Sequence, residues 1–395
     1  MNKVVIAGLV VGVLVAGVIF SPLMSGKFQS QAQAQQAPAT GKMKKVLLIA
    51  SEKVVQVAPD NALHPGGIKY NAMVFNGTIP GPVIAIDQGD TLQLTLKNSG
   101  KLVHSIDLHA GYGADKANSG PVLPGQSKTW TLQGIYAGAF FYHCSADALN
   151  GIWEHISNGM YGGIIVHPRD EQPAKEFYVV FGENYNTADQ GLFKGTNGKI
   201  GSFDIAKFIN EQPDLILTNG MAHKYVPAVG QVVKLSINKN AEIFKVKPGE
   251  LTRWYIFDAG PNDNVGFHFI GGIMSVRDGS ILNRYGTQDL NDDTWNIPVG
   301  SGSVIESTFP SPGLYVGVGH NMNHVLKGGA FAVLAANNST ESDHPIGTWV
   351  PPKGSTTTGD TPAGKPYMPA VSAAQKPVMG APSGTLPGLA SGIPS

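Results

Sequence analysis

Residues 83–98 read VIAIDQGDTLQLTLKN, in which apolar and polar side chains alternate on both sides of the pair Gln88-Gly89. Alternation with a period of two residues is typical of a β-strand with one buried face, and a Gly-containing pair between two such runs predicts a turn. Similar runs follow at 128–132, 139–144 and 162–166. The sequence therefore predicts an all-β fold built from short strands.

The composition is consistent with a β protein that has many turns. Gly (50) and Pro (27) are abundant among the 395 residues, whereas charged residues make up only 14%. Lys+Arg and Asp+Glu both total 28, so no net charge is available to attract nucleic acid. A chain of this length is too long for one typical core and predicts about two domains.

The second half of the chain repeats the first. Residues 242–260, EIFKVKPGELTRWYIFDAG, resemble residues 83–98, and Gly249 falls where the first copy has its turn glycine. Farther on, AGAFFYHC (137–144) resembles PGLYVGVGH (312–320), since each has a glycine followed by an aromatic-containing strand with a terminal His. Two copies of one β unit explain this repeat, and the second copy contains no Cys.

Both ends of the chain differ from the β pattern. An apolar segment follows the first basic residue and precedes an Ala-x-Ala motif, so residues 1–34 fit either a cleaved signal peptide or a retained membrane anchor. Either interpretation implies export to the periplasm or another extracytoplasmic compartment. Residues 337–395 are rich in Pro and small residues, which predicts a disordered tail. We expect the two domains at 45–168 and 169–336.

The only cysteine of the chain, Cys144, lies in a run that also contains His155 and Met160, and His104 lies upstream of it. A thiolate, two imidazoles and a weak thioether favour copper in a trigonal site with a long axial bond. An isolated cysteine is otherwise more often a buried, inert thiol. Its combination with the other three residues favours copper, and a single Cys excludes a disulfide within the chain.

Strand geometry predicts a second group of ligands. In the run HSIDLH, which begins at His104, alternation places Asp107 and His109 on the face opposite to His104. His143 and Cys144 are neighbours, so they also point to opposite faces. If His104 and Cys144 hold a metal inside the domain, the other three residues face outward together and form part of a second metal site. Without a metal, they would be surface side chains.

Two imidazoles are too few for a stable site, and the repeat offers His268 and His320 as further ligands. A third imidazole would leave one position open for water or substrate, as in catalytic rather than structural metal sites. Because His143 and Cys144 are covalent neighbours, the two metals would lie on the order of a dozen Å apart. Such a separation gives an electron a short path through bonds.

The motifs HSIDLHA, FYHC, HISNGMYG, GFHFIGG and VGHN resemble those of copper-containing nitrite reductases in order and spacing. The resemblance covers about residues 45–335. It implies two tandem cupredoxin-like Greek-key domains, each a β-sandwich or barrel, and a homotrimer with catalytic sites between subunits. It also implies reduction of nitrite to nitric oxide, as in denitrification, with two copper ions per subunit. The electron donor would be a small cupredoxin or a cytochrome c.

The resemblance further implies a role for each motif residue. The type 1 copper, which accepts electrons, would be held by His104, Cys144, His155 and Met160. The type 2 copper, where nitrite binds, would be held by His109, His143 and His320, with the electron arriving through Cys144-His143. Asp107 and His268 would position nitrite and deliver protons, and Ile270 would line the pocket.

The sequence departs from the family pattern in two places. The segment from Cys144 to His155 is slightly longer than in the best-known members, and GGIM at 271–274 lacks a histidine often found there. The remaining histidines fit no motif. We expect His324 to be a core or solvated residue and the other four to lie at the surface: His64, His167, His223 and His344.

Three other functions are alternatives for this sequence. A multicopper oxidase with a trinuclear cluster needs several His-x-His pairs, but the sequence contains none and has Ser at position 145. A non-enzymatic blue-copper electron carrier would leave the outward histidines and Asp107 unexplained. A two-copper oxidoreductase acting on another small nitrogen compound, such as hydroxylamine or nitric oxide, stays open. No CxxCH motif is present, so the sequence contains no site for a fused c-type haem.

Overall fold

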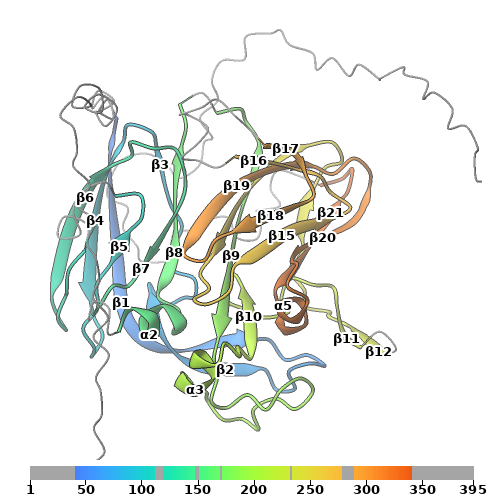
Figure 1. Cartoon of the computed structure of the whole chain (residues 1–395), viewed down its shortest axis with the longest axis horizontal. Helices are drawn as coiled ribbons and strands as arrows, with labels where there is room; N and C mark the ends of the chain where they lie inside the picture. Colours follow the sequence, from blue (N-terminus) through green and yellow to red (C-terminus); the bar gives the residue numbers. More distant parts are fainter. Residues whose placement is uncertain are drawn as a thin grey trace, which may run out of the picture.

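The computed structural model describes residues 41–111, 119–146, 151–169, 171–231, 234–277 and 289–339. The predicted signal or anchor segment and almost all of the predicted tail lie outside these residues, as does His344. Within the described ranges, no helix is both long and apolar enough to cross a membrane. Strands dominate the described residues, and the all-β prediction is confirmed (Figure 1).

Two four-stranded sheets form a first sandwich. One sheet has the order β2-β1-β4-β6 and contains β1 (Met43–Ala58), β2 (Ile68–Phe75), β4 (Thr91–Asn98) and β6 (Ser127–Gln133). The other has the order β3-β8-β7-β5 and contains β3 (Ile84–Asp87), β5 (Asp107–Leu108), β7 (Gly138–His143) and β8 (Tyr161–His167). The predicted turn lies between β3 and β4, where Gly89 has φ 98°, a conformation that glycine adopts without strain.

Two larger sheets form a second sandwich. The six-stranded sheet has the order β10-β9-β14-β19-β16-β17 and contains β9 (Lys175–Asn184), β10 (Leu215–Thr218), β14 (Leu251–Asp258), β16 (Met274–Arg277), β17 (Asp289–Asp292) and β19 (Ser301–Thr308). The five-stranded sheet has the order β13-β21-β20-β15-β18 and contains β13 (Phe244–Val246), β15 (Val265–Ile270), β18 (Thr294–Ile297), β20 (Gly313–Gly319) and β21 (Ala330–Ala335). A separate hairpin contains β11 (Ala228–Gln231) and β12 (Lys234–Ile237). The described residues also form the short helices α2 (Ile152–Ser157), α3 (Ile205–Ile209) and α5 (Met322–Lys327).

The repeat predicted from the sequence is present in the order of the strands. The run β3-β8-β7-β5 in the first sandwich corresponds to β13-β21-β20-β15 in the second. In both runs the first pair of strands is parallel and the next two pairs are antiparallel. His143 ends β7 and His320 follows β20, so these two histidines occupy equivalent places in the two sandwiches.

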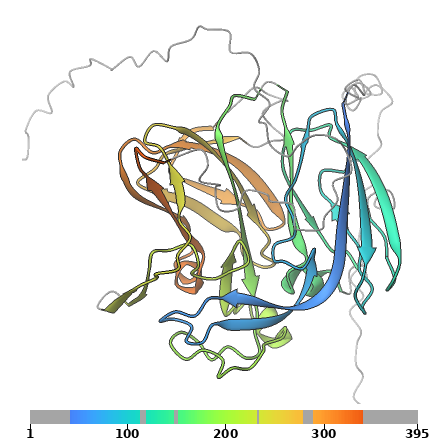
Figure 2. The ribbon, with the colours of Figure 1, turned by 180° about the vertical axis from the view of Figure 1, so that it is seen from behind.

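Strand β7 contributes to two cores because it is covered on both faces. Tyr142 and Cys144 belong to the core of the first sandwich. Ala139 and Phe141 belong to a second cluster that includes side chains of β9, β14 and β19, so β7 packs the two sandwiches against each other. Figures 1 and 2 show the sandwiches side by side. A strand buried on both faces has a nearly continuous apolar sequence, which explains the run GAFFY.

Strand β1 is long and serves both sandwiches. Up to Ala50 it pairs with β4, and beyond that residue it pairs with β2 alone. The far part of this β1–β2 hairpin packs Val57 and Tyr70 against Leu215 and Leu217 of β10. The point where β1 leaves β4 lies close to the loop that leads to His104.

Candidate metal centres

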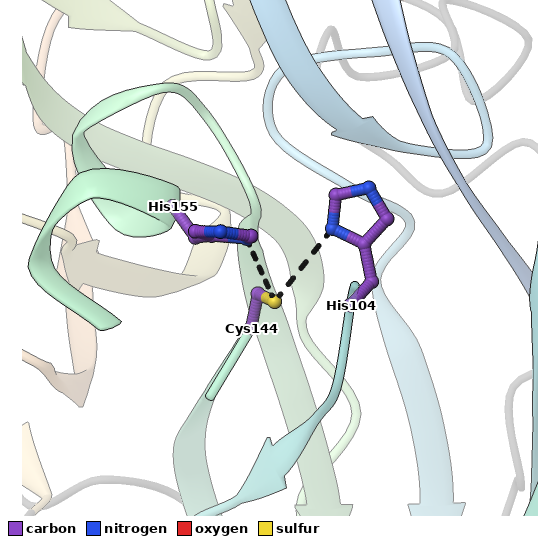
Figure 3. Close-up of side chains that lie close together, drawn as sticks. All are labelled: His104, Cys144 and His155. Carbon is purple, nitrogen blue, oxygen red and sulfur yellow. Dashed lines mark hydrogen bonds between the residues drawn. The ribbon is translucent and has the colours of Figure 1, made fainter. Parts of the chain in front are cut away.

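The first group of predicted ligands converges at one end of the first sandwich. Cys144 follows β7 and is fully buried, and its Sγ lies 3.2 Å from Nδ1 of His155 on α2 and 4.0 Å from Nδ1 of His104. Figure 3 shows both imidazole rings facing the sulfur. The backbone N–H of Cys144 donates to the carbonyl oxygen of Met160 at 3.0 Å, so the structure brings all four predicted residues together.

His155 lies on the short helix α2. In α2, Trp153 stacks on Phe208 with ring centroids 5.2 Å apart, and Glu154 lies in the first turn, where an acidic side chain is favourable. This packing fixes the helix on one side. His155, on another side of the helix, is buried and faces Cys144.

The donor set around Cys144 fits copper. A thiol and two imidazole nitrogens lie within 4.8 Å of one another and are buried, and Met160 is fully buried in the same core cluster as Cys144. The backbone N–H of Ser105 donates to Sγ at 3.3 Å, a contact that favours the thiolate form. Soft sulfur and imidazole ligands select copper rather than Mg²⁺ or Ca²⁺, which require oxygen.

The second group lies on the other face of β7. Asp107 on β5 pairs directly with His143, and Nε2 of His109 lies 3.1 Å from Nε2 of His143. Oδ2 of Asp107 lies 3.7 Å from Nε2 of His143 and 3.9 Å from Nε2 of His109. Since His143 belongs to this group and Cys144 to the first, the two adjacent side chains point to opposite faces.

The electrostatics of the second group favour neutral imidazoles. Nδ1 of His143 donates to the carbonyl oxygen of Cys144 at 2.9 Å, which leaves the lone pair on Nε2. Burial lowers the pKa of His143 to about 4, and burial also lowers the pKa of His109. Neutral imidazole is the form that binds metal ions, so these residues can supply part of a metal site.

The third group lies on the second sandwich. His268 on β15 and His320 after β20 have ring centroids 5.5 Å apart. The backbone N–H of His320 donates to the carbonyl oxygen of Gly266 at 2.6 Å, and Nδ1 of His268 donates to the carbonyl oxygen of Asp293. Ile270 is 53% exposed and lies two residues after His268, on the same face of β15.

The second and third groups are separate within one chain. Around His143, the possible ligand atoms of described residues that lie within 4.8 Å of one another come only from Asp107, His109 and His143. Each chain therefore carries one group with two imidazoles and a carboxylate, and another group with two imidazoles.

The structure corrects our expectation for two other histidines. His64 and His223 are buried rather than at the surface, and Nε2 of His64 lies 3.1 Å from Nδ1 of His223. Burial lowers their pKa values to about 4 and about 3. His167 is partly buried against Glu171, whereas His324 is a core residue, within the expected alternatives.

Glu52 is a further candidate functional residue that no sequence motif predicts, and its Oε1 lies 2.9 Å from Nε2 of His104. Burial disfavours ionisation of this carboxyl, but hydrogen bonds from the backbone of Lys101 and from His104 outweigh it and lower the pKa of Glu52. Glu52 belongs to no motif and lies in an ordinary alternating strand, so nothing in the local sequence distinguishes it.

The chain is similar to known copper proteins. Residues 56–171 match a family model described as multicopper oxidase. The chain is 32% identical over 276 residues to a copper-containing nitrite reductase of Neisseria meningitidis, with 68% of this chain and 64% of that protein covered. A copper-containing nitrite reductase of Neorhizobium galegae is 30% identical over 273 residues, covering 67% of this chain and 69% of that protein.

The fold also resembles that of solved structures. A copper nitrite reductase from Nitrosomonas europaea has a TM-score of 0.63 at 28% identity, with 75% of this chain and 95% of that chain covered. Against the Neisseria relative, in contrast, the chain spans slightly less than two thirds of the relative's length.

Proposed function

The chain belongs to the family of copper-containing nitrite reductases, and we propose that it reduces nitrite to nitric oxide. One observation carries the proposal: the adjacent residues His143 and Cys144 point into two different groups of metal-binding side chains. A simple electron carrier needs only the group around Cys144. The outward group gives a separate place for a substrate, joined to the first by a single peptide unit.

We propose that two copper ions bind to these groups. The type 1 ion would be held by His104, Cys144, His155 and Met160. The type 2 ion would be held by His109, His143 and His320. When bound, copper supplies a one-electron couple at the first site and a Lewis acid for an anionic substrate at the second. The backbone and side chains of Cys144 and His143 then form the covalent path between the sites.

Asp107 and His268 are the residues to which we assign proton delivery. Conversion of nitrite to nitric oxide and water consumes one electron and two protons. The Asp107 carboxylate lies beside both outward imidazoles and its side chain is 39% exposed, so it can exchange protons with solvent. His268 would supply the second donor group, since imidazole exchanges protons near neutral pH.

The separation of the outward groups supports assembly from several copies of the chain. One copy would contribute Asp107, His109 and His143, and its neighbour would contribute His268 and His320, with Ile270 covering the pocket. A heterologous contact forms a ring when its rotation closes, and we propose such a ring, a homotrimer. Each subunit would contain two cupredoxin-like domains at 45–168 and 169–336. The exported protein would take electrons from a small cupredoxin or a cytochrome c.

The proposal is tested by an anaerobic assay for nitric oxide together with metal analysis of the purified protein. We expect two copper ions per subunit and nitric oxide formation from nitrite with a chemical electron donor. One copper per subunit without nitric oxide would identify an electron carrier instead. Two copper ions per subunit together with faster reduction of hydroxylamine than of nitrite would indicate that hydroxylamine, and not nitrite, is the substrate.

Replacing Asp107 with asparagine is expected to slow nitrite turnover by about 100-fold or more, since a positioned general acid contributes roughly 10²–10⁴-fold. Both copper ions should be retained, because the amide leaves the two imidazoles in place. Turnover and copper content of Asp107→Asn would be compared with those of Asp87→Asn. Asp87 lies on β3, at the opposite edge of the same sheet. Equal nitrite turnover in the two variants would contradict a role of Asp107 in proton delivery.

A further inference from the structure

We propose that Glu52 is a positioning residue that orients His104 and lowers the reduction potential of the copper held there. The inference rests on the proposed function, because it treats His104 as a copper ligand. It is carried by contacts between β1 and the loop that precedes His104.

The path of β1 brings Glu52 to this loop. At Ala50, β1 stops pairing with β4, and the backbone N–H of Ser99 donates to the carbonyl oxygen of Ala50 at 2.9 Å. The next residues of the loop then pass the Glu52 side chain. Oε2 accepts the backbone N–H of Lys101 at 2.8 Å, and Oε1 accepts that of Leu102 at 3.1 Å. Glu52 is thus held in place independently of His104.

Gly100 permits this close approach. A Cβ atom at position 100 would lie 2.6 Å from Oε1 and 2.8 Å from Oε2 of Glu52, closer than real Cβ contacts. Only glycine allows the loop backbone to lie against the carboxylate in this way. The carboxylate and the loop therefore fit each other, and the loop leads directly to His104.

The contact with Glu52 determines which nitrogen of His104 is free to bind a metal. A carboxylate only accepts hydrogen bonds, so Nε2 of His104 must carry the proton at the 2.9 Å contact with Oε1. The lone pair then lies on Nδ1, the atom that faces Sγ of Cys144 (Figure 3). His104 is fully buried, and the Glu52 carboxylate accepts the hydrogen bond of its Nε2.

A negatively charged hydrogen-bond partner makes an imidazole a stronger electron donor to its metal. Stronger donation stabilises the oxidised ion more than the reduced ion, and a nearby negative charge acts in the same direction. Glu52 would consequently lower the type 1 reduction potential. Its side chain is 30% exposed, and solvent therefore weakens the effect without abolishing it.

The test compares Glu52→Gln and Glu52→Leu with a matched control, Glu250→Gln. Glu250 also accepts a backbone hydrogen bond, from Lys247 at 2.8 Å, but it lies in the second sandwich. The measurements are the type 1 absorption band, its reduction potential, the copper affinity of the site and the melting temperature of the copper-free protein. The last measurement separates a loss of fold from an effect on the metal.

For Glu52→Gln we expect the absorption band to persist and the reduction equilibrium to shift about tenfold toward Cu(I), equivalent to a 59 mV rise for one electron. For Glu52→Leu we expect copper affinity at the type 1 site to fall by about 10- to 100-fold. Glu250→Gln should match the wild type in both quantities. An unchanged reduction potential in Glu52→Gln would overturn the inference.

A direct measurement on the unmodified chain covers the case in which the variants do not fold. Nitrogen-15 NMR of copper-free protein should show the His104 proton on Nε2, and a proton on Nδ1 would overturn the inference. Failure of the proposed function is distinguishable from failure of this inference. A wild-type protein without any type 1 band would overturn both, whereas a normal band with an unchanged Glu52→Gln potential overturns only the role of Glu52.

Discussion

Replacing Cys144 with alanine is expected to abolish the visible charge-transfer band, reduce the copper content to one ion per subunit and lower nitrite turnover to background. The side chain is the only thiol in the chain, and no described residue could replace its sulfur as an anionic soft ligand. Without this ligand the two buried imidazoles cannot hold copper in a form that accepts electrons. Absorption spectroscopy, metal analysis and the nitric oxide assay measure the three effects.

The fold should survive this substitution. The hydrogen bond between positions 144 and 160 uses backbone atoms, and the removed sulfur is small. Ser145→Ala is a suitable control because its hydroxyl donates to Oγ of Ser105 at 3.0 Å, in the same loop but outside the ligand set. We expect the Ser145→Ala protein to keep the visible charge-transfer band. A coloured Cys144→Ala protein would contradict the type 1 assignment.

Replacing His320 with alanine is expected to remove the type 2 electron-spin resonance signal and nitrite turnover while the type 1 band persists. Loss of one of three imidazole ligands leaves His109 and His143, which are too few to retain the ion. The group around Cys144 lies on the other face of β7 and should be unaffected. Asn323→Ala, an exposed change on α5, should behave like the wild type.

A mixing experiment tests whether His320 acts across a subunit boundary. His320→Ala and His109→Ala would each be inactive alone. If subunits of the two variants are assembled together in equal amounts, an intact site requires an unsubstituted His109 on one copy and an unsubstituted His320 on its neighbour. With random assortment each of these two conditions is met with a probability of about one half. About a quarter of the sites should therefore be intact, which gives about a quarter of wild-type activity. Absence of any recovered activity would indicate that all ligands come from the same chain.

Much of the fold and of the candidate sites could be predicted from local sequence. The alternation at 83–98 identified two strands and their turn, and the similar motifs in the two halves predicted two copies of one β unit. The opposite directions of His143 and Cys144 follow from strand geometry. Short-range features of this kind depend only on consecutive residues, so they can be recognised without knowing how the chain packs.

The helix around His155 was harder to predict. Its position depends on the stacking of Trp153 on Phe208 of α3, a contact over 55 residues of sequence that the local pattern does not record. The burial of His64 was missed for a related reason. This side chain is enclosed only because the β1–β2 hairpin packs on the second sandwich and brings it to His223, 159 residues away.

The sequence alone was sufficient for the strands, the repeat and the types of side chain that bind copper, because periodicity and ligand chemistry are properties of short stretches. Tertiary structure was needed for the partner of His104, which is 52 residues away, and for the separation of His143 from His320. Contacts of this kind depend on where whole sheets lie relative to one another. That arrangement results from the packing of several apolar clusters at once, and no single stretch of sequence contains it.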